Sequence, residues 1–298
     1  MNLVEIKEKN KQDLILGNNV TNTEAKMSLY KRNINNKKWC LLKEYYNLDG
    51  KYFSNKMLTI HQLIFNKEEI HSFVPNLILP NYLASRKNTV VGYTMDYHPS
   101  VNLHSVLSSY DFTVEEKLAY LKEVGEVFEN LKQMRDKSSV TDMYLNDVHE
   151  DNFIIDEKGK LFAVDVDSCK ITNNEPFAAK YLIGSLPALR SAPKKFNGDE
   201  NEFGIIYKPT EETDLHCYLI MILNFLYNDR SVQKMTMEEY YEYMEYLDSL
   251  GLSNEVLSIF LDMYTSKPNI NPKEVLDALK EVYPRSTKNV YNCVRKRK

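Results

Sequence analysis

The stretch 147–165 constrains the fold of this chain more than any other part of the sequence. Two short apolar runs of β type flank a polar turn that contains a glycine. Folded as a hairpin centred on Lys158 and Gly159, these runs pair Asn152 with Asp165. The hairpin therefore brings an amide and a carboxylate side chain to the same end of a rigid ladder.

Oxygen ligands held in this way suit a hard divalent cation. Mg²⁺ prefers carboxylate, amide and phosphate oxygens, and Asp165 and Asn152 offer the first two. Asp147 lies on the loop just before the first strand, where its carboxylate can act on a group that approaches the metal. The stretch thus predicts a metal site with a separate acid beside it.

The same residue types at the same spacing occur in the protein kinase superfamily, which this chain resembles. The catalytic loop of the family (H-R-D-x-x-x-x-N) and its D-F-G motif appear here around Asp147 and Asn152, and as Asp165-Val166-Asp167. The resemblance implies ATP and Mg²⁺ as cofactors, with Asn152 and Asp165 as metal ligands. It also implies that Asp147 orients and deprotonates the hydroxyl that accepts the γ-phosphoryl group.

The resemblance further implies an α+β, bilobal, protein-kinase-like fold. Residues 1–96 would form a small N-terminal lobe with an antiparallel sheet and one helix, and residues 97–298 a larger, mainly helical C-terminal lobe. Alternating or apolar runs indicate the strands, and apolar residues at helical spacing indicate the helices. We expect strands over 12–16, 24–31, 39–46 and 90–95, a helix capped by Ser54, and helices over 102–107, 114–134, 213–227 and 235–250.

The residues that would bind the nucleotide lie in the N-terminal lobe. Lys43 ends an apolar run that resembles the third strand of the family, whose lysine holds the α- and β-phosphates of ATP. Met95, Asp96 and Tyr97 resemble the hinge between the lobes, where adenine would lie against backbone groups. The glycine-rich phosphate loop of the family is reduced to Gly17, so fewer backbone N–H groups can approach phosphate closely.

In kinases a glutamate on the helix after the third strand pairs with the strand lysine. Glu68 and Glu69 lie near the end of the predicted helix, whereas the mid-helix position holds Gln62. The sequence leaves open which of these three is the partner of Lys43. Asp167 stands where the family has the glycine of D-F-G, either as a second metal carboxylate or as a solvated loop acid.

Two features indicate different branches of the superfamily. The segments 184–193 and 260–279 resemble the close of the activation segment and the closing helices of protein kinases. His149, two positions after Asp147, instead resembles the phosphotransferases of the aminoglycoside type. Asn146 replaces the arginine that receives an activation-loop phosphate, so control by such phosphorylation is not expected.

Asp214 opens a stretch that is apolar nearly all round, which indicates a buried helix. In the family the corresponding aspartate steadies the backbone of the catalytic loop, so the resemblance implies a structural role for Asp214. Lys194 and Asn271 stand where the family has the glutamate and the arginine of a buried ion pair. Both partners are replaced together, which avoids leaving one buried charge unpaired.

Composition narrows the class of protein. The chain has 298 residues, 43% of them hydrophobic and 27% charged, with a formal net charge of −4. This balance is that of a soluble globular protein and argues against a nucleic-acid partner. The longest mainly apolar stretch, 215–227, is too short to span a bilayer. Because no secretory signal opens the sequence and the cysteines show no metal-type spacing, we expect a cytoplasmic protein with reduced thiols.

Three functions follow from these features. The retained Asp147 and Lys43 favour an ATP-dependent protein Ser/Thr kinase. His149 favours a kinase-fold enzyme whose substrate is a small hydroxylated molecule. The poor phosphate loop around Gly17 favours a pseudokinase, a module that binds nucleotide or acts as a scaffold without phosphoryl transfer. The expected partners are ATP and either a protein substrate or a small hydroxylated molecule.

Overall fold

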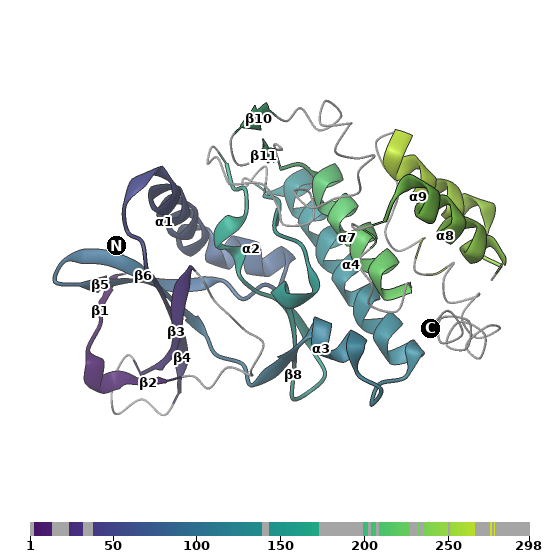
Figure 1. Ribbon diagram of the computed structural model, residues 1–298. Helices are drawn as coiled ribbons and strands as arrows, with labels where there is room; N and C mark the ends of the chain where they lie inside the picture. The colour runs from purple at the N-terminus through teal and green to yellow at the C-terminus, as the bar shows by residue number, and fades with distance from the viewer. Residues whose placement is uncertain are drawn as a thin grey trace.

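The computed structural model describes residues 3–13, 24–31, 38–138, 143–172, 199–201, 204–206, 209–226, 232, 235–249, 251–265, 275 and 277. Across these residues the chain is an α+β protein, with a six-stranded sheet toward one end and a group of long helices toward the other (Figure 1). The segments that carry the predicted site lie between the two.

The large sheet is formed by the N-terminal third of the chain, with strand order β1-β5-β6-β4-β3-β2. Its strands are β1 (Leu3–Glu5), β2 (Lys11–Asp13), β3 (Ala25–Tyr30), β4 (Cys40–Tyr45), β5 (Pro80–Arg86) and β6 (Thr89–Asp96). The expectation of a purely antiparallel sheet is wrong, because β1 pairs with β5 in the parallel direction. A 3₁₀ turn, η1 (Glu8–Asn10), separates β1 from β2, and the two strands lie on opposite edges of the sheet.

Two helices rather than one follow β4. Helix α1 (Gly50–Phe65) and helix α2 (Lys67–Phe73) are separated at Asn66, which has φ −95° and ψ 11°. The predicted start at Ser54 is wrong by about one turn, because the helix begins at Gly50 and the Ser54 hydroxyl donates to the Gly50 carbonyl at 3.1 Å. Serine bonds to a helix carbonyl as readily as it caps a helix end, so residue type alone misplaced the start.

The predicted hairpin forms, but its register differs by one residue. Strand β8 (Phe153–Asp156) pairs antiparallel with β9 (Leu161–Ala163). Asn152 consequently faces Val164, whose N–H donates to the Asn152 carbonyl at 2.9 Å. Asp165 lies one residue beyond the position expected for it.

The turn explains this shift of register. The carboxylate of Asp156 accepts hydrogen bonds from the backbone N–H groups of Lys158 and Lys160, at 2.8 and 2.9 Å. Gly159 has φ +77°, a left-handed conformation that glycine adopts without strain. A turn of this kind holds three residues between the strands instead of two, which moves the pairing by one position.

The remaining described elements are mainly helical. They are β7 (Ser100–Asn102), α3 (Leu103–Ser108), α4 (Val114–Lys137), α7 (Glu211–Leu226), α8 (Met237–Ser249) and α9 (Asn254–Thr265), with a two-stranded ladder of β10 (Asp199–Asn201) and β11 (Gly204–Ile206). Strand β7 joins β8 and β9 in a three-stranded sheet. Thr113 and Glu116 form a reciprocal capping box at the start of α4, which determines where this helix begins.

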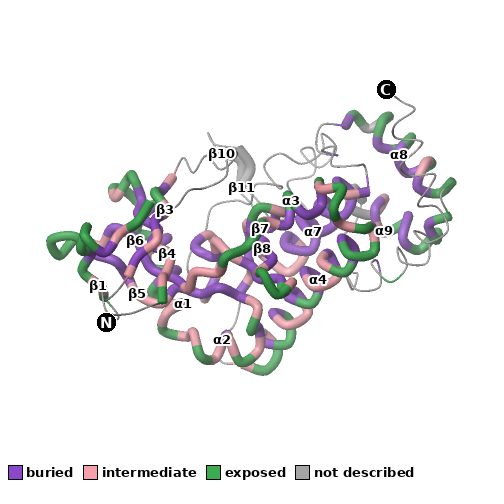
Figure 2. Tube along the Cα trace, turned by 90° about the horizontal axis from the view of Figure 1, so that it is seen from below, coloured by how far each residue is buried: buried purple, intermediate pink, exposed green. Residues whose placement is uncertain are grey.

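The larger apolar core extends from the sheet into the helices, and Figure 2 shows its buried residues along α4 and α7. The predicted stripe on α4 is buried throughout, as packing requires: Leu118, Leu121, Val124, Val127, Phe128 and Leu131. Helix α7 buries nearly all of its side chains, which confirms that expectation. The Tyr218 hydroxyl of α7 donates to the Leu121 carbonyl of α4 at 2.6 Å, so the two helices are joined by a polar contact inside the core.

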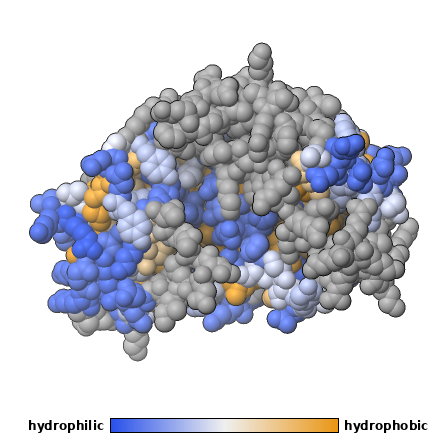
Figure 3. Space-filling view, in the orientation of Figure 1, coloured by the Kyte–Doolittle hydropathy of each residue, from blue (hydrophilic) through white to orange (hydrophobic). Residues whose placement is uncertain are grey.

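Several sequence predictions lie outside the described residues. They concern Gly17 and its loop, the segment 184–193, Lys194 and Asn271. No helix in the described part of the chain is long and apolar enough to cross a membrane. On the face shown in Figure 3, hydrophilic side chains cover most of the described surface over the large sheet.

Candidate functional site

Lys43 lies in the middle of the large sheet. Its strand β4 is flanked by β3 and β6, where Lys43 pairs with Met27 and with Tyr93. The backbones approach closely at this point, since a Cβ added to Gly92 would lie 1.9 Å from the Lys43 carbonyl oxygen. The side chain of Lys43 is only 3% exposed. The sheet therefore determines where its ammonium group lies.

The ammonium of Lys43 contacts two carboxylates from the segment after β9. Its Nζ lies 2.5 Å from Oδ1 of Asp165 and 2.7 Å from Oδ2 of Asp167. Burial alone would lower the pKa of Lys43, but the two carboxylates raise it well above its usual value. Lys43 and Asp165 are separated by 122 positions in the sequence, and the fold brings these two predicted site residues into direct contact.

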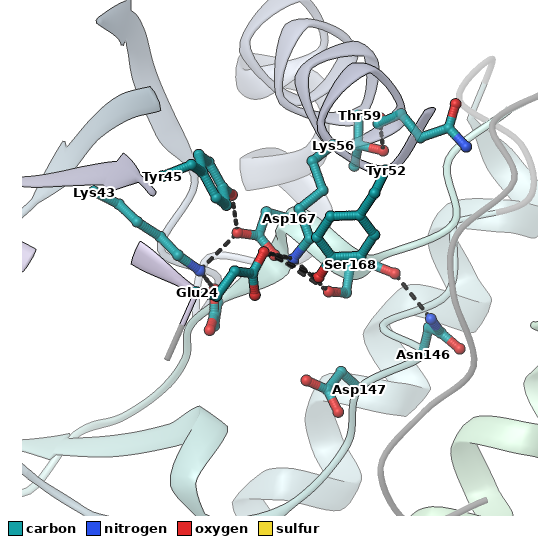
Figure 4. A network of polar contacts seen from close by, with 12 residues as sticks. Glu24, Lys43, Tyr45, Tyr52, Lys56, Thr59, Asn146, Asp147, Asp167 and Ser168 are labelled. Atoms are coloured by element: carbon teal, nitrogen blue, oxygen red, sulfur yellow. Dashed lines mark hydrogen bonds and ion pairs between the residues drawn. The ribbon is translucent and has the colours of Figure 1, made fainter. Parts of the chain in front are cut away.

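Asp167 is enclosed between the sheet and helix α1. It belongs to the 3₁₀ turn η3 (Val166–Ser168), and its side chain is 1% exposed. Its Oδ1 accepts a hydrogen bond from Lys56 Nζ at 2.8 Å, and its Oδ2 accepts from Lys43 and from the Tyr45 hydroxyl. Figure 4 shows Lys43 coming from the sheet and Lys56 from α1 to meet at this carboxylate. Burial would raise the pKa of Asp167, but the two lysines hold it well below its usual range.

These contacts bear on the two interpretations of Asp167. The interpretation as a solvated loop acid is wrong, because the side chain is buried and both of its oxygens accept hydrogen bonds from protein groups. A carboxylate with both oxygens bound by lysines is a less ready metal ligand than Asp165, whose side chain is 40% exposed. Asp167 instead links the sheet, η3 and α1.

No acidic side chain of α1 or α2 pairs with Lys43 among the residues that the structure describes. Gln62 lies in α1, and its buried Oε1 has no hydrogen-bond partner in the described part of the chain. Glu68 and Glu69 lie in α2, where the carboxylate of Glu69 accepts a hydrogen bond from the hydroxyl of Ser138 at the C-terminal end of α4. The helix residue that reaches the Lys43 site is the cation Lys56.

Sequence reasoning missed Lys56, although a signal for it exists. Lys56 is buried on the same face of α1 as Phe53, Ile60 and Leu63, at the three- and four-residue spacing of a helix. A lysine on the apolar face of a helix is costly to bury unless a carboxylate meets it. In this chain Asp167 meets it at 2.8 Å, and Glu24 meets it at 2.8 Å as well.

The backbone of the loop before Asp147 is held by Asp214, as expected. The two carboxylate oxygens of Asp214 accept hydrogen bonds from the N–H groups of Leu145 and Asn146, each at 2.7 Å. Burial raises the pKa of Asp214 to about 7, although these two N–H groups act to lower it. Asn146 has φ 65°, and its side-chain amide donates to the Ser168 carbonyl at 3.0 Å. The loop is thereby tied both to α7 and to η3.

Asp147 follows this anchored segment and remains accessible, with its side chain 28% exposed. The amide nitrogen of Asn152 donates to the Asp147 carbonyl at 2.8 Å and to its Oδ2 at 3.2 Å. Nε2 of His149 lies 3.6 Å from the same carboxylate oxygen. Two neighbours therefore orient the carboxylate, and Figure 4 shows it apart from the cluster around Asp167.

The residues expected to hold Mg²⁺ fit that ion chemically. Asp165 has a left-handed backbone (φ 57°, ψ 45°) just beyond β9, and one of its carboxylate oxygens lies on Lys43. Asn152 donates through its amide nitrogen to Asp147, which leaves its amide oxygen as the ligand atom. Carboxylate and amide oxygens suit Mg²⁺. The described residues contain no group of three His, Cys, Asp or Glu side chains that could hold a metal ion. The remaining ligands would have to be phosphate and water oxygens.

The predicted hinge lies where the chain leaves the large sheet. Met95 and Asp96 are the last residues of β6, and Tyr97 begins the short link to β7. Met95 is buried, whereas Asp96 is partly exposed and lies 3.4 Å from Lys38. The chain therefore leaves the large sheet at these residues and continues into β7, and their role as a hinge stays a prediction.

Comparison of the chain with models of known protein families and with curated proteins finds no match.

Proposed function

We propose that this chain is an ATP- and Mg²⁺-dependent phosphotransferase with a protein-kinase-like fold, which transfers the γ-phosphoryl group of ATP to a hydroxyl. The observation that carries the proposal is the contact of Lys43 with Asp165 at 2.5 Å. The sequence assigned Lys43 to phosphate and Asp165 to the metal, from segments 122 positions apart. Their contact supports a single site for a metal–nucleotide complex.

The surrounding residues support distinct roles in transfer. Lys43 would bind the α- and β-phosphates, and Asp165 with Asn152 would hold Mg²⁺, which neutralises charge on the phosphate oxygens when bound. Asp147 would accept the proton of the attacking hydroxyl, since its carboxylate is both oriented by Asn152 and exposed. Asp214 fixes the backbone that carries this acid, so that little reorganisation is needed for the reaction.

The acceptor is either a protein hydroxyl or a small hydroxylated molecule. His149 supports the second, because it resembles the histidine of aminoglycoside-type phosphotransferases; its buried ring lies 3.6 Å from Oδ2 of Asp147. Phosphate transfer to a panel of small polyols and aminoglycosides, beside a general protein substrate, separates these two classes.

A second candidate is a nucleotide-binding or scaffold module that performs no transfer. The same Lys43–Asp165 contact favours it, because the groups expected at phosphate and metal neutralise each other until a ligand separates them. A chain in which this pair stays closed would bind a partner through its surface without phosphoryl transfer.

The decisive experiment is incubation with γ-labelled ATP and Mg²⁺, using wild type and the Asp147→Asn and Asp165→Asn variants. Asp248→Asn is the matched control, because this exposed aspartate lies on α8, which carries no residue of the proposed site. We expect label transfer by wild type and by the control, and loss of about 10²-fold or more in the two site variants.

Thermal denaturation with Mg-ATP separates the candidates. A ligand that binds only the folded chain raises its melting temperature, and the stabilisation grows with the logarithm of the ligand concentration divided by Kd. A shift without transfer supports the module without activity. If wild type shows no transfer and no shift at millimolar Mg-ATP, the phosphotransferase and a nucleotide-binding module are both overturned, and only a scaffold that binds no nucleotide fits the result.

A further inference from the structure

Two lysines from different elements share one buried carboxylate beside the proposed phosphate site. Lys43 of β4 and Lys56 of α1 lie 2.7 and 2.8 Å from opposite oxygens of Asp167. The side chains of all three residues are at most 6% exposed. A buried charge cluster of this kind is costly unless its geometry is well determined, and the assigned roles of Lys43, Asp165 and Asn152 make no use of Lys56.

We infer that Asp167, anchored to helix α1 by Lys56, is the residue that positions Lys43 for the nucleotide phosphates. Lys56 and Asp167 are positioning residues, because they act on the ligand through Lys43. This inference rests on the proposed function, since it assigns a task within the same ATP site. The position of α1 would then determine the position of the Lys43 ammonium, because Lys56 of α1 binds Asp167 of η3 and Asp167 binds Lys43.

Asp165 cannot perform this task throughout the reaction. It is 40% exposed, contacts Lys43 through Oδ1, and is the carboxylate proposed for the metal. When Asp165 turns to a bound metal, Lys43 keeps only the contact with Asp167 among the carboxylate contacts that the structure describes. A second anion that never leaves is therefore needed to hold the ammonium in place.

The surroundings of Asp167 suit a permanent anchor. The Tyr45 hydroxyl donates to its Oδ2, and the Ser168 hydroxyl lies 3.2 Å from its Oδ1. Lys56 is restrained in turn by Glu24 at 2.8 Å and by Ser168 Oγ at 3.2 Å. Figure 4 shows these side chains closing around the carboxylate between the strand and the helix. Lys43 is thus held by its place in the sheet, and Lys56 is held by Glu24 and Ser168.

The test is a double-mutant cycle on ATP affinity, measured by calorimetry with and without Mg²⁺. Asp167→Asn should weaken ATP binding about tenfold in the wild-type background, the range expected for a lost charge-assisted contact. In a Lys43→Met background the same substitution should change the affinity less than about twofold, because its effect passes through Lys43. Equal effects in both backgrounds overturn the inference.

Variants of Lys56 keep the test informative should Asp167→Asn fail to fold. Lys56→Met should weaken ATP binding as Asp167→Asn does, and Lys56→Arg should restore the affinity to within about threefold of wild type. Glu24→Gln removes one restraint on Lys56 and leaves the Lys56–Asp167 contact in place, so it should weaken ATP binding less than Lys56→Met does. A loss in Glu24→Gln as large as that in Lys56→Met overturns the inference.

Failure of the inference and failure of the proposed function are distinguishable in this experiment. If wild type binds ATP but Lys56→Met and Asp167→Asn bind it equally well, the positioning role is wrong and the ATP site stands. If wild type itself binds no ATP at millimolar concentration, both proposals are wrong.

Discussion

Asp167 and Asp214 are buried to the same extent, each 2% exposed, yet their pKa values move in opposite directions. Lys43 and Lys56 bind Asp167, and they hold its pKa well below the usual range against the effect of burial. Asp214 is bound by two backbone N–H groups, and burial raises its pKa to about 7. Burial therefore does not decide the state of a buried carboxylate, and the charge of its donors does.

The difference also separates two kinds of attachment. Asp167 links three elements through side chains that carry full charges, and loss of its own charge would leave Lys43 with Asp165 alone and Lys56 with Glu24 alone. Asp214 holds one loop through dipoles, and a neutral side chain of the same shape can do part of that work. The four predictions that follow test this contrast, from the largest expected effect to the smallest.

The largest effect is expected from replacing each aspartate by its amide. Asp167→Asn should lower the free energy of unfolding at pH 7 by about 3 to 5 kcal/mol, because it breaks a buried ion pair. Asp214→Asn should lower it by about 1 to 3 kcal/mol, because the amide oxygen still accepts from one backbone N–H group while the other loses its acceptor. Urea denaturation of both variants checks the contrast, which equal losses would contradict.

The second prediction concerns pH and a histidine near Asp214 on α7. Burial lowers the pKa of His216 to about 4 and raises that of Asp214 to about 7. Above pH 6.5 His216 is neutral in both the folded and the unfolded chain, so it does not affect the free energy of unfolding. As pH falls from 6.5 toward 4 the unfolded chain takes up the proton first, and the free energy of unfolding decreases. The contribution of Asp214 to the free energy of unfolding is fully present below pH 4, where the carboxyl is protonated in both states. This contribution is lost as pH rises through 7. The two slopes oppose each other, so they offset in wild type.

Single variants should expose each slope. Relative to wild type, Asp214→Asn should gain stability as pH rises from 4 to 6.5, and His216→Asn should lose stability over the same range. Each change should amount to about 3 kcal/mol, at roughly 1.4 kcal/mol per unit of pKa shift. Chemical denaturation at several pH values measures the change. If both variants keep the pH profile of wild type, Asp214 and His216 are not the source of the two slopes.

The third prediction removes one donor from Asp167. Tyr45→Phe deletes the hydroxyl that donates to Oδ2 while its ring can keep packing against Phe53. A hydrogen bond to a charged group contributes about 2 kcal/mol, so the free energy of unfolding should fall by about that amount. Tyr218→Phe is the matched control, because its hydroxyl donates to a neutral backbone carbonyl. An equal loss in both would show that the charge of the acceptor is unimportant here.

The smallest effect is expected at Ser168. Its hydroxyl lies 3.2 Å from both Asp167 Oδ1 and Lys56 Nζ, a long distance for either contact. Ser168→Ala should therefore lower the free energy of unfolding by about 1 kcal/mol or less. A loss as large as that in Tyr45→Phe would indicate that Ser168 is an essential part of the cluster.

Local patterns in the sequence located most of the elements correctly. The apolar stripe on α4 and the apolar stretch of α7 lie in the core, and the aspartate that opens that stretch holds the loop backbone. These predictions succeeded because apolar residues at helical spacing form one face of a helix, and that face is stable only when it is buried. The hairpin was also recognised, but its register was missed by one residue because Asp156 and Gly159 select a longer turn.

The sequence by itself determined which residues are available for the proposed site: the acid Asp147, the proposed metal ligands Asn152 and Asp165, and the strand lysine Lys43. Only the tertiary structure decided which charged side chains contact each other. The helix supplies Lys56 rather than an acid, and Asp167 turns inward to match it. Those contacts join residues more than a hundred positions apart, for which local spacing carries no information. Their cause is the requirement that every buried charge finds an opposite charge or enough donors.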